Sequence, residues 1–334
     1  MSHLQYAAVG LAVLKRSMGN NPDEPDQNTP EAPNYKLPPL TWGLVFLITL
    51  LFVPAFLFTS YSLKSVYTTL AIVENPTPAA IRRTYKLLRA ANGWRGNYRG
   101  FWLAVLIFIL AAVGTFAVAA IPFVPSFVAA LIVALGLVQL QTAWVHTVIR
   151  ATPSSTPVWR NLPPFRRTFE ATSIPTFLQW AAGVVTTLVS VLLTKALDLP
   201  QHHSGPSYEV PAYSHDLIWK AIVLFVVALV LVFALSIPAN VILVRVQASL
   251  LPPDEETVVP FDRSFNGTVE PAVVGGRSYV TIRDAFRTFS RASWKRVYLL
   301  YIKLQVLSII VNVVYLAIVV PLVVLTSSKV EGPN

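Results

Sequence analysis

Basic side chains at a spacing of four residues are the strongest chemical signal in this chain. The four that recur at this spacing near the C-terminus are Arg283, Arg287, Arg291 and Lys295. A helix through them would carry one basic stripe, with Phe286 and Phe289 on a neighbouring face. Such a helix can lie in a membrane interface, with its rings buried and its guanidinium groups among lipid phosphates. We therefore predict that this segment binds anionic lipid or a protein partner.

Two earlier segments repeat this combination of cations and aromatic rings. Residues 81–95 carry the basic residues Arg82, Arg83, Lys86 and Arg89. In the middle segment Arg166 and Arg167 lie between Phe165 and Phe169, just after two prolines that interrupt the pattern. The alternative for all three segments is that the cations only satisfy the positive-inside rule and pack on the rest of the protein.

Uncharged amides inside apolar stretches form a second candidate site. They are Gln139, Gln141, Gln179, Asn240 and Asn312. Around a cavity at the bilayer midplane, these amides could bind a polar solute, as discontinuous helices do in transporters. They could equally form hydrogen bonds between neighbouring helices. The apolar stretches contain no acidic residue that could carry a proton or sodium ion.

Enzyme and metal chemistry have little support. The chain has no cysteine, which excludes disulfides, thiolate metal sites and thiol nucleophiles. His202, His203 and His215 lie in a stretch that also contains Gly205 and Pro206, and we expect a solvated loop there. No phosphate-binding loop, zinc-protease motif or serine elbow is present. We therefore expect neither an enzyme nor a cofactor nor a bound metal.

The elements that must position these residues are six long apolar stretches. They span residues 42–62, 101–121, 126–146, 174–196, 217–245 and 297–326. Each can cross the ~30 Å hydrocarbon core as a helix of about 20 residues. Only 13% of the residues are charged, against about 25% in soluble domains. The predicted fold class is all-α, a polytopic membrane protein of about six helices in three hairpin-like repeats with basic interfacial amphipathic helices.

The distribution of charge predicts the topology and the partner. Of 26 Lys and Arg residues, 19 lie in residues 63–100, 147–173 and 245–296, which are alternate connections between the stretches. The opposite connections, 121–125 and 197–216, contain neither Lys nor Arg. This pattern places the three basic connections in the cytosol or the mitochondrial matrix and both termini on the other side. The net charge of +10 therefore indicates anionic lipid as a partner, and no nucleic acid.

The predicted organisation is one membrane domain with short tails. We expect a tail at 1–40 with a disordered Pro-rich part, a single six-helix domain at 41–327 and a C-terminal tail at 328–334. The domain also repeats weakly: aligning Pro76, Pro153 and Pro252 places residues 62–76, 139–153 and 238–252 in register without gaps. Each aligned segment is followed by a polar stretch, an Arg-bearing segment and another apolar stretch.

Two sets of residues resemble known families. Residues 238–248 (PANVILVRVQA) are similar to the Pro-x-Asp-x-x-Lys and Arg-x-Gln signature of mitochondrial carriers. That resemblance implies a solute transporter with three hairpins, although Asn240 and Leu243 replace the acid and the base of the signature. Residues 284–289 (DAFRTF) resemble multi-pass bacterial and fungal proteins that repeat an Arg-rich amphipathic helix, among them the membrane domains attached to some glycerophosphodiesterases. As a whole the chain resembles multi-pass membrane proteins of filamentous fungi.

These patterns favour a non-enzymatic integral membrane protein that organises lipid or a membrane partner through its basic loops. The alternative is a solute transporter, such as a degenerate relative of the mitochondrial carriers. A polar cavity at the midplane would favour transport, and basic helices beside an apolar bundle would favour the organiser. An endomembrane of the ER type and the mitochondrial inner membrane both fit the charge pattern.

Overall fold

The computed structural model describes residues 35–36, 38–73, 81–151, 160, 162–199, 215–252, 255–262, 264–265, 279–326 and 328–329. The described residues form helices almost throughout, so the all-α prediction is confirmed. Five helices are long and apolar enough to cross a membrane, and a bent pair of helices makes a sixth candidate. The chain thus has the architecture of a multi-pass integral membrane protein.

The described residues contain five candidate spans, a sixth formed by a bent pair of helices, and two short helices. The first three spans are α2 (Pro39–Leu57) with η1 (Phe58–Tyr67) and α3 (Thr68–Val73), η2 (Gly93–Tyr98) with α5 (Phe101–Ala119), and α6 (Ser126–Gly136) with α7 (Val138–Ile149). The last three are α8 (Phe165–Ala196), α9 (His215–Leu231) with η4 (Val232–Ser236) and α10 (Ile237–Ser249), and α12 (Arg291–Thr326). The short helices α4 (Ile81–Asn92) and α11 (Ile282–Arg287) precede α5 and α12.

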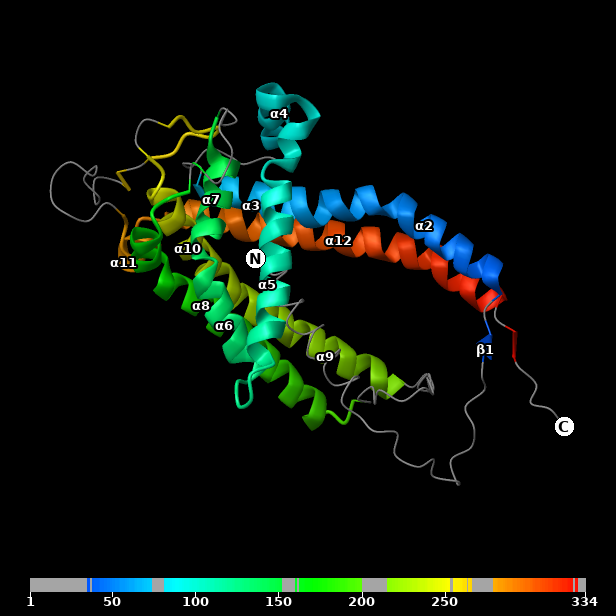
Figure 1. Ribbon diagram of the computed structural model, residues 1–334. Helices are drawn as coiled ribbons and strands as arrows, with labels where there is room; N and C mark the ends of the chain where they lie inside the picture. The colour runs from blue at the N-terminus through cyan, green and yellow to red at the C-terminus, as the bar shows by residue number, and fades with distance from the viewer. Residues whose placement is uncertain are drawn as a thin grey trace.

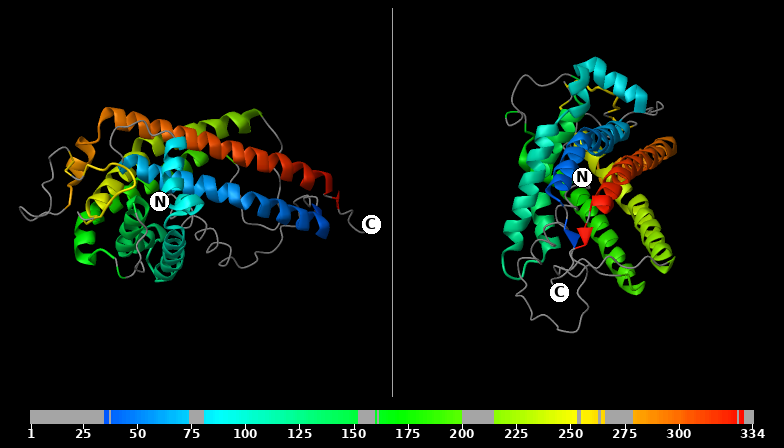
Figure 2. Two further views of the ribbon diagram at one scale, coloured as in Figure 1. Left: turned by 90° about the horizontal axis from the view of Figure 1, so that it is seen from above. Right: turned by 90° about the vertical axis from the view of Figure 1, so that its right-hand side faces the viewer.

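The spans form two groups that diverge from a common base (Figure 1). One group, the two-helix arm, consists of α2 packed against α12. The other, the four-helix layer, consists of α5, α6, α8 and α9, in which each helix packs against the next. At the far end of the arm, β1 (Tyr35–Lys36) pairs antiparallel with β2 (Ser328–Lys329). Figure 2 shows the same divergence from two further directions.

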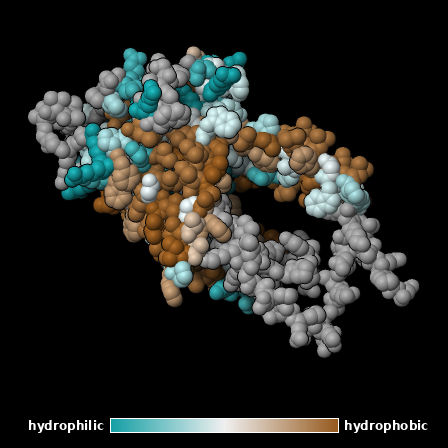
Figure 3. Space-filling view, viewed as in Figure 1, coloured by the Kyte–Doolittle hydropathy of each residue, from teal (hydrophilic) through white to brown (hydrophobic). Residues whose placement is uncertain are grey.

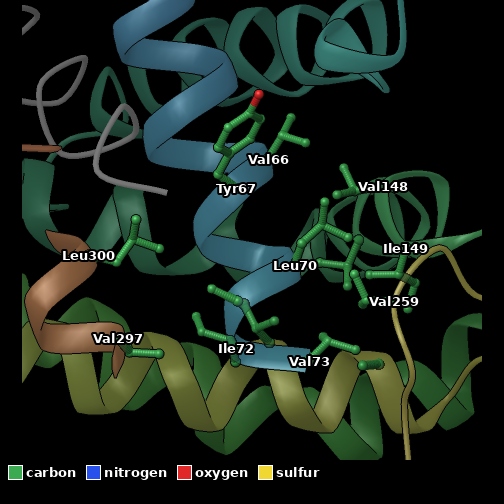
Figure 4. Close-up of a cluster of buried hydrophobic side chains, with 14 of the residues drawn as sticks. Val66, Tyr67, Leu70, Ile72, Val73, Val148, Ile149, Val259, Val297 and Leu300 are labelled. Atoms are coloured by element: carbon green, nitrogen blue, oxygen red, sulfur yellow. The ribbon is translucent and has the colours of Figure 1, made fainter. Parts of the chain in front are cut away.

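The common base is a core formed where three helices end. The helices α3, α7 and α10 pack against one another there, together with the first turns of α12. Figure 4 shows Leu70 of α3 near Val148 and Ile149 of α7, and Val297 and Leu300 of α12 nearby. The polar surface gathers at this end, while apolar residues cover the long helices (Figure 3). We call this end the basic end.

The apolar parts of the spans are hardly buried by the protein. At most 17% of the apolar window of any of the five unbroken spans is buried, and none of that of α12. A soluble protein rarely exposes apolar surface on this scale. Lipid tails are as apolar as leucine side chains, so a bilayer would cover these helices without cost. The exposed helices therefore fit a lipid environment.

The weak sequence repeat coincides with the core. Its three aligned segments contain α3, α7 and α10, each of which is buried over most of its length. The regular α-helix is also interrupted at the same position of each repeat. Segments η1 and η4 are π-helical, and a bend of 57° separates α6 from α7. When the three prolines are aligned, the π-helical residues 232–236 correspond to residues 56–60, and the bend at 136–137 corresponds to residues 59–60. Both positions fall where η1 begins, at Phe58. The three spans thus change geometry where they enter the core.

Pro238 explains the interruption in the fifth span. Proline has no backbone N–H, so its position in a helix leaves a carbonyl one turn back without a donor. The structure places the π-helical turn η4 directly before α10, which contains Pro238. The hydroxyl of Tyr298 donates to the carbonyl of Phe233 at 3.1 Å. A side chain of α12 therefore replaces the missing donor.

Two expectations about helix limits were wrong. The stretch expected to end at residue 62 continues as helix to Val73, and the stretch expected to begin at 174 begins at Phe165. Several polar residues in these extensions are buried and donate to carbonyls one turn back in their own helix, which a hydropathy pattern does not detect; they include Thr68, Thr69, Thr168 and Thr172. The expectation of a single basic helix through residues 283–295 was also wrong, because α11 ends at Arg287 and α12 begins at Arg291. Ser290 separates them and caps α12 by accepting from the backbone N–H of Ser293.

Candidate functional site

The predicted basic residues lie on the helices of the basic end, and most of their side chains are exposed. The exposed ones are Arg82, Lys86 and Arg89 on α4, Arg166 on α8, Arg283 and Arg287 on α11, and Arg291 and Lys295 on α12. Arg167 is half-buried, and Arg83 belongs to α4 but its side chain lies outside the described residues. Arg166 forms an ion pair with Glu170 at 3.0 Å, which reduces its availability to a ligand.

Helix α4 has two different faces. Arg82, Lys86 and Arg89 are exposed, whereas Leu88 is fully buried and joins the main core. Tyr85 packs against the same core from α4. The helix is therefore held to the protein by its apolar face and presents its cations outward.

An aromatic cluster lies beside the cations of α11 and α12. Trp294 contacts Phe286, Phe289 and Tyr298, with ring centroids separated by 5.5, 5.0 and 5.7 Å. Phe286 remains 48% exposed next to Arg287. Aromatic rings with polar neighbours are favoured at the level of lipid headgroups. The combination of exposed cations and rings can bind the phosphate groups of a membrane surface.

Sequence reasoning missed a set of buried and half-buried basic residues at the same end. Arg99, His146 and Arg245 are buried, and Arg150 and Arg296 are half-buried. Arg99 donates to three backbone carbonyls at the end of α7, those of Val148, Arg150 and Ala151. No spacing signal separates them: Arg99 and Arg296 each precede an aromatic residue by two positions, but so does the exposed Arg287.

Two of these arginines, Arg150 and Arg245, contact the segment that follows α10. Arg150 forms an ion pair with Glu255 at 3.0 Å, and the backbone of Thr257 bridges to that of Arg150. The guanidinium of Arg245 lies over the rings of Phe265 and Phe289, at 4.8 and 4.9 Å from their centroids. Such cation–π contacts are strongest when they are desolvated. These residues build the scaffold that positions the exposed cations.

The five predicted midplane amides are distributed over four helices. Gln139 donates to the carbonyl of Pro163 at 2.7 Å, and Asn312 donates to that of Ser308 at 2.8 Å. Asn240 donates to the hydroxyl of Tyr301 at 3.0 Å. Three of the five amides therefore bond within the protein. Gln141 is 4% exposed, and neither of its amide atoms has a hydrogen-bond partner among the described residues. Gln179 is half-buried, and its Oε1 likewise has no partner among these residues.

No group of three or more His, Asp or Glu side chains that could hold a metal ion occurs in the part of the chain that the structure describes. His202 and His203 lie outside the described residues.

Comparison with family models, curated proteins and solved structures finds no match to this chain. The functional argument therefore rests on the geometry of the basic end and of the diverging helices.

Proposed function

We propose that this chain is a non-enzymatic membrane protein that organises lipid, binding anionic headgroups at its basic end. The observation that carries the proposal is the placement of the exposed cations. They surround the packed end of the molecule, while the long apolar helices diverge from it and leave their surfaces to lipid. A protein partner with an acidic membrane-proximal surface is the related alternative.

The physical basis is the attraction between clustered cations and an anionic surface. Each Lys or Arg near such a surface contributes about 1 kcal/mol. Salt weakens this attraction, since the screening length is about 8 Å at physiological ionic strength. Arg283, Arg287, Arg291 and Lys295 lie on the same two consecutive helices. Together they can distinguish an anionic from a neutral headgroup.

The test is lipid retention by the full-length protein. The variant replaces Arg283, Arg287, Arg291 and Lys295 by glutamine, and the matched control replaces Lys195 and Lys220, which lie near the opposite ends of α8 and α9. After reconstitution with mixed anionic and neutral lipids, the annular lipids are quantified by mass spectrometry. We expect the variant to lose its enrichment in anionic lipid and the control to keep it. Equal lipid composition around all three proteins would reject the proposal.

Solute transport remains the second candidate, because the buried amide of Gln141 has no hydrogen-bond partner among the residues that the structure describes. An amide that finds no partner in the protein costs free energy unless a ligand or water satisfies it. Three of the other four predicted amides weaken this candidate, because Gln139, Asn240 and Asn312 already donate to protein groups.

A further inference from the structure

The C-terminal ends of the three core helices carry a repeated contact. Ala71, Val148 and Gln247 each lie five residues before the proline that defines the repeat, so they occupy equivalent positions. They lie near the ends of α3, α7 and α10. The last carbonyls of a helix have no partner within the helix and need a donor from elsewhere.

Each of the three equivalent carbonyls is contacted by a basic side chain. The Nη2 of Arg296 donates to the carbonyl of Ala71 at 3.1 Å. The Nη1 of Arg99 donates to that of Val148 at 3.5 Å and to that of Arg150 at 2.5 Å, and its Nη2 donates to that of Ala151 at 2.8 Å. The Nε2 of His146 lies 2.9 Å from the carbonyl of Gln247. A carbonyl oxygen only accepts, so this nitrogen carries the hydrogen.

The three contacts run in a closed order around the repeats. Arg99 belongs to the first repeat and contacts the second, His146 belongs to the second and contacts the third, and Arg296 belongs to the third and contacts the first. Arg99 and Arg296 are cations, and cations at helix C-termini interact favourably with the helix dipole. Hydrogen bonds from charged donors are also stronger than those between neutral groups. Arg99 and His146 are 7% and 4% exposed, so water competes little with these bonds.

We propose that Arg99, His146 and Arg296 form a clasp that holds the C-terminal ends of α3, α7 and α10 together at the basic end. The link through His146 is the weakest of the three, because it is a single bond from an imidazole, whereas the other two links come from guanidinium groups that are always charged. The core would therefore open first between α7 and α10. This inference does not depend on lipid binding by the exposed cations.

The absence of cysteine from the chain allows a direct test with introduced thiols. Ala248→Cys reports on the His146 link and Ala71→Cys on the Arg296 link, since these alanines are 1% and 3% exposed. The reporters react with a membrane-impermeant maleimide in the full-length protein, in the presence and absence of His146→Leu or Arg296→Ala. Arg287→Ala, which removes an exposed arginine at the same end, is the matched control. Ala285→Cys, which is fully buried in a neighbouring cluster, reports on general loosening.

Loss of a link should raise the labelling rate of its own reporter at least about tenfold, because an unpaired buried carbonyl favours opening by that order. His146→Gln, which keeps an N–H donor, should restore much of the protection at Ala248→Cys. The clasp is refuted if neither link variant changes labelling, or if Arg287→Ala raises it equally. It is also refuted if Ala285→Cys becomes reactive to the same extent, since the basic end would then be unfolding as a whole.

Discussion

The two halves of the first span differ in a way that summarises the molecule. Residues 39–57 form α2, in which Thr41 is the one buried residue of the helix and large apolar side chains such as Leu51 are exposed. Residues 58–73 form η1 and α3, which are almost entirely buried although they contain several Ser and Thr residues. The more apolar half is thus outside and the more polar half inside, the reverse of a soluble protein.

Two different environments explain this contrast. Lipid solvates the apolar half, so packing it against other helices offers little hydrophobic gain. In the polar half, Thr59, Thr68 and Thr69 donate to carbonyls of their own helix. Tyr61 and Tyr67 donate to Arg99 and Asn97, which precede α5, so this half is packed against other parts of the protein. The diverging helices therefore supply the anchorage in the membrane, and the lipid binding that we propose belongs to the basic end.

The sharpest test of the contrast removes one leucine from each half. Leu70→Ala empties a site that is 1% exposed, whereas Leu51→Ala changes a side chain that is 70% exposed in the same span. Burial predicts a loss of about 2–5 kcal/mol for Leu70→Ala and a much smaller change for Leu51→Ala. Unfolding of the purified protein in detergent, followed by tryptophan fluorescence, measures both. Similar losses would show that the arm is as tightly packed as the core.

Two glycines give a second, smaller contrast. A β-carbon on Gly96 would lie 2.1 Å from the carbonyl oxygen of Leu88, whereas one on Gly43 would meet nothing within 4 Å. Gly96→Ala should therefore destabilise the basic end by roughly 1–3 kcal/mol through overpacking. Gly43→Ala lies within α2 and should stabilise that helix by up to about 1 kcal/mol. Thermal shifts of opposite sign are expected, and a stabilising Gly96→Ala would contradict the close approach of η2 to α4.

The smallest effect on stability is expected at Asn240, where the lipid and transport candidates separate. Its amide donates to Tyr301 between α10 and α12, and such bonds contribute about 0.6 kcal/mol on average in membranes. Asn240→Leu should therefore leave expression and thermal stability nearly unchanged. The decisive measurement is uptake of a metabolite panel by proteoliposomes. Selective loss of uptake in the variant would support a carrier, and an unmutated protein that moves nothing on the panel would remove that candidate.

The helices and the grouping of charge could be predicted from the sequence because both are local properties. Runs of about 20 apolar residues and clusters of Lys and Arg require no knowledge of distant contacts. The predicted basic residues on α4, α8, α11 and α12 are largely exposed, as a surface role requires. The helix limits at the basic end were less accurate, because polar residues such as Thr68 and Thr69 are buried there by neighbours far along the chain.

The amino-acid sequence by itself determined that this is a helical membrane protein with three basic connections and a weak threefold repeat. The tertiary structure decided which cations remain exposed and which become buried. Arg99 and Arg287 have the same chemistry, yet the first caps a helix of another repeat and the second is exposed. The carbonyls that Arg99 binds lie 49 to 52 residues further along the chain. Only folding brings such a donor to the helix ends that lack one.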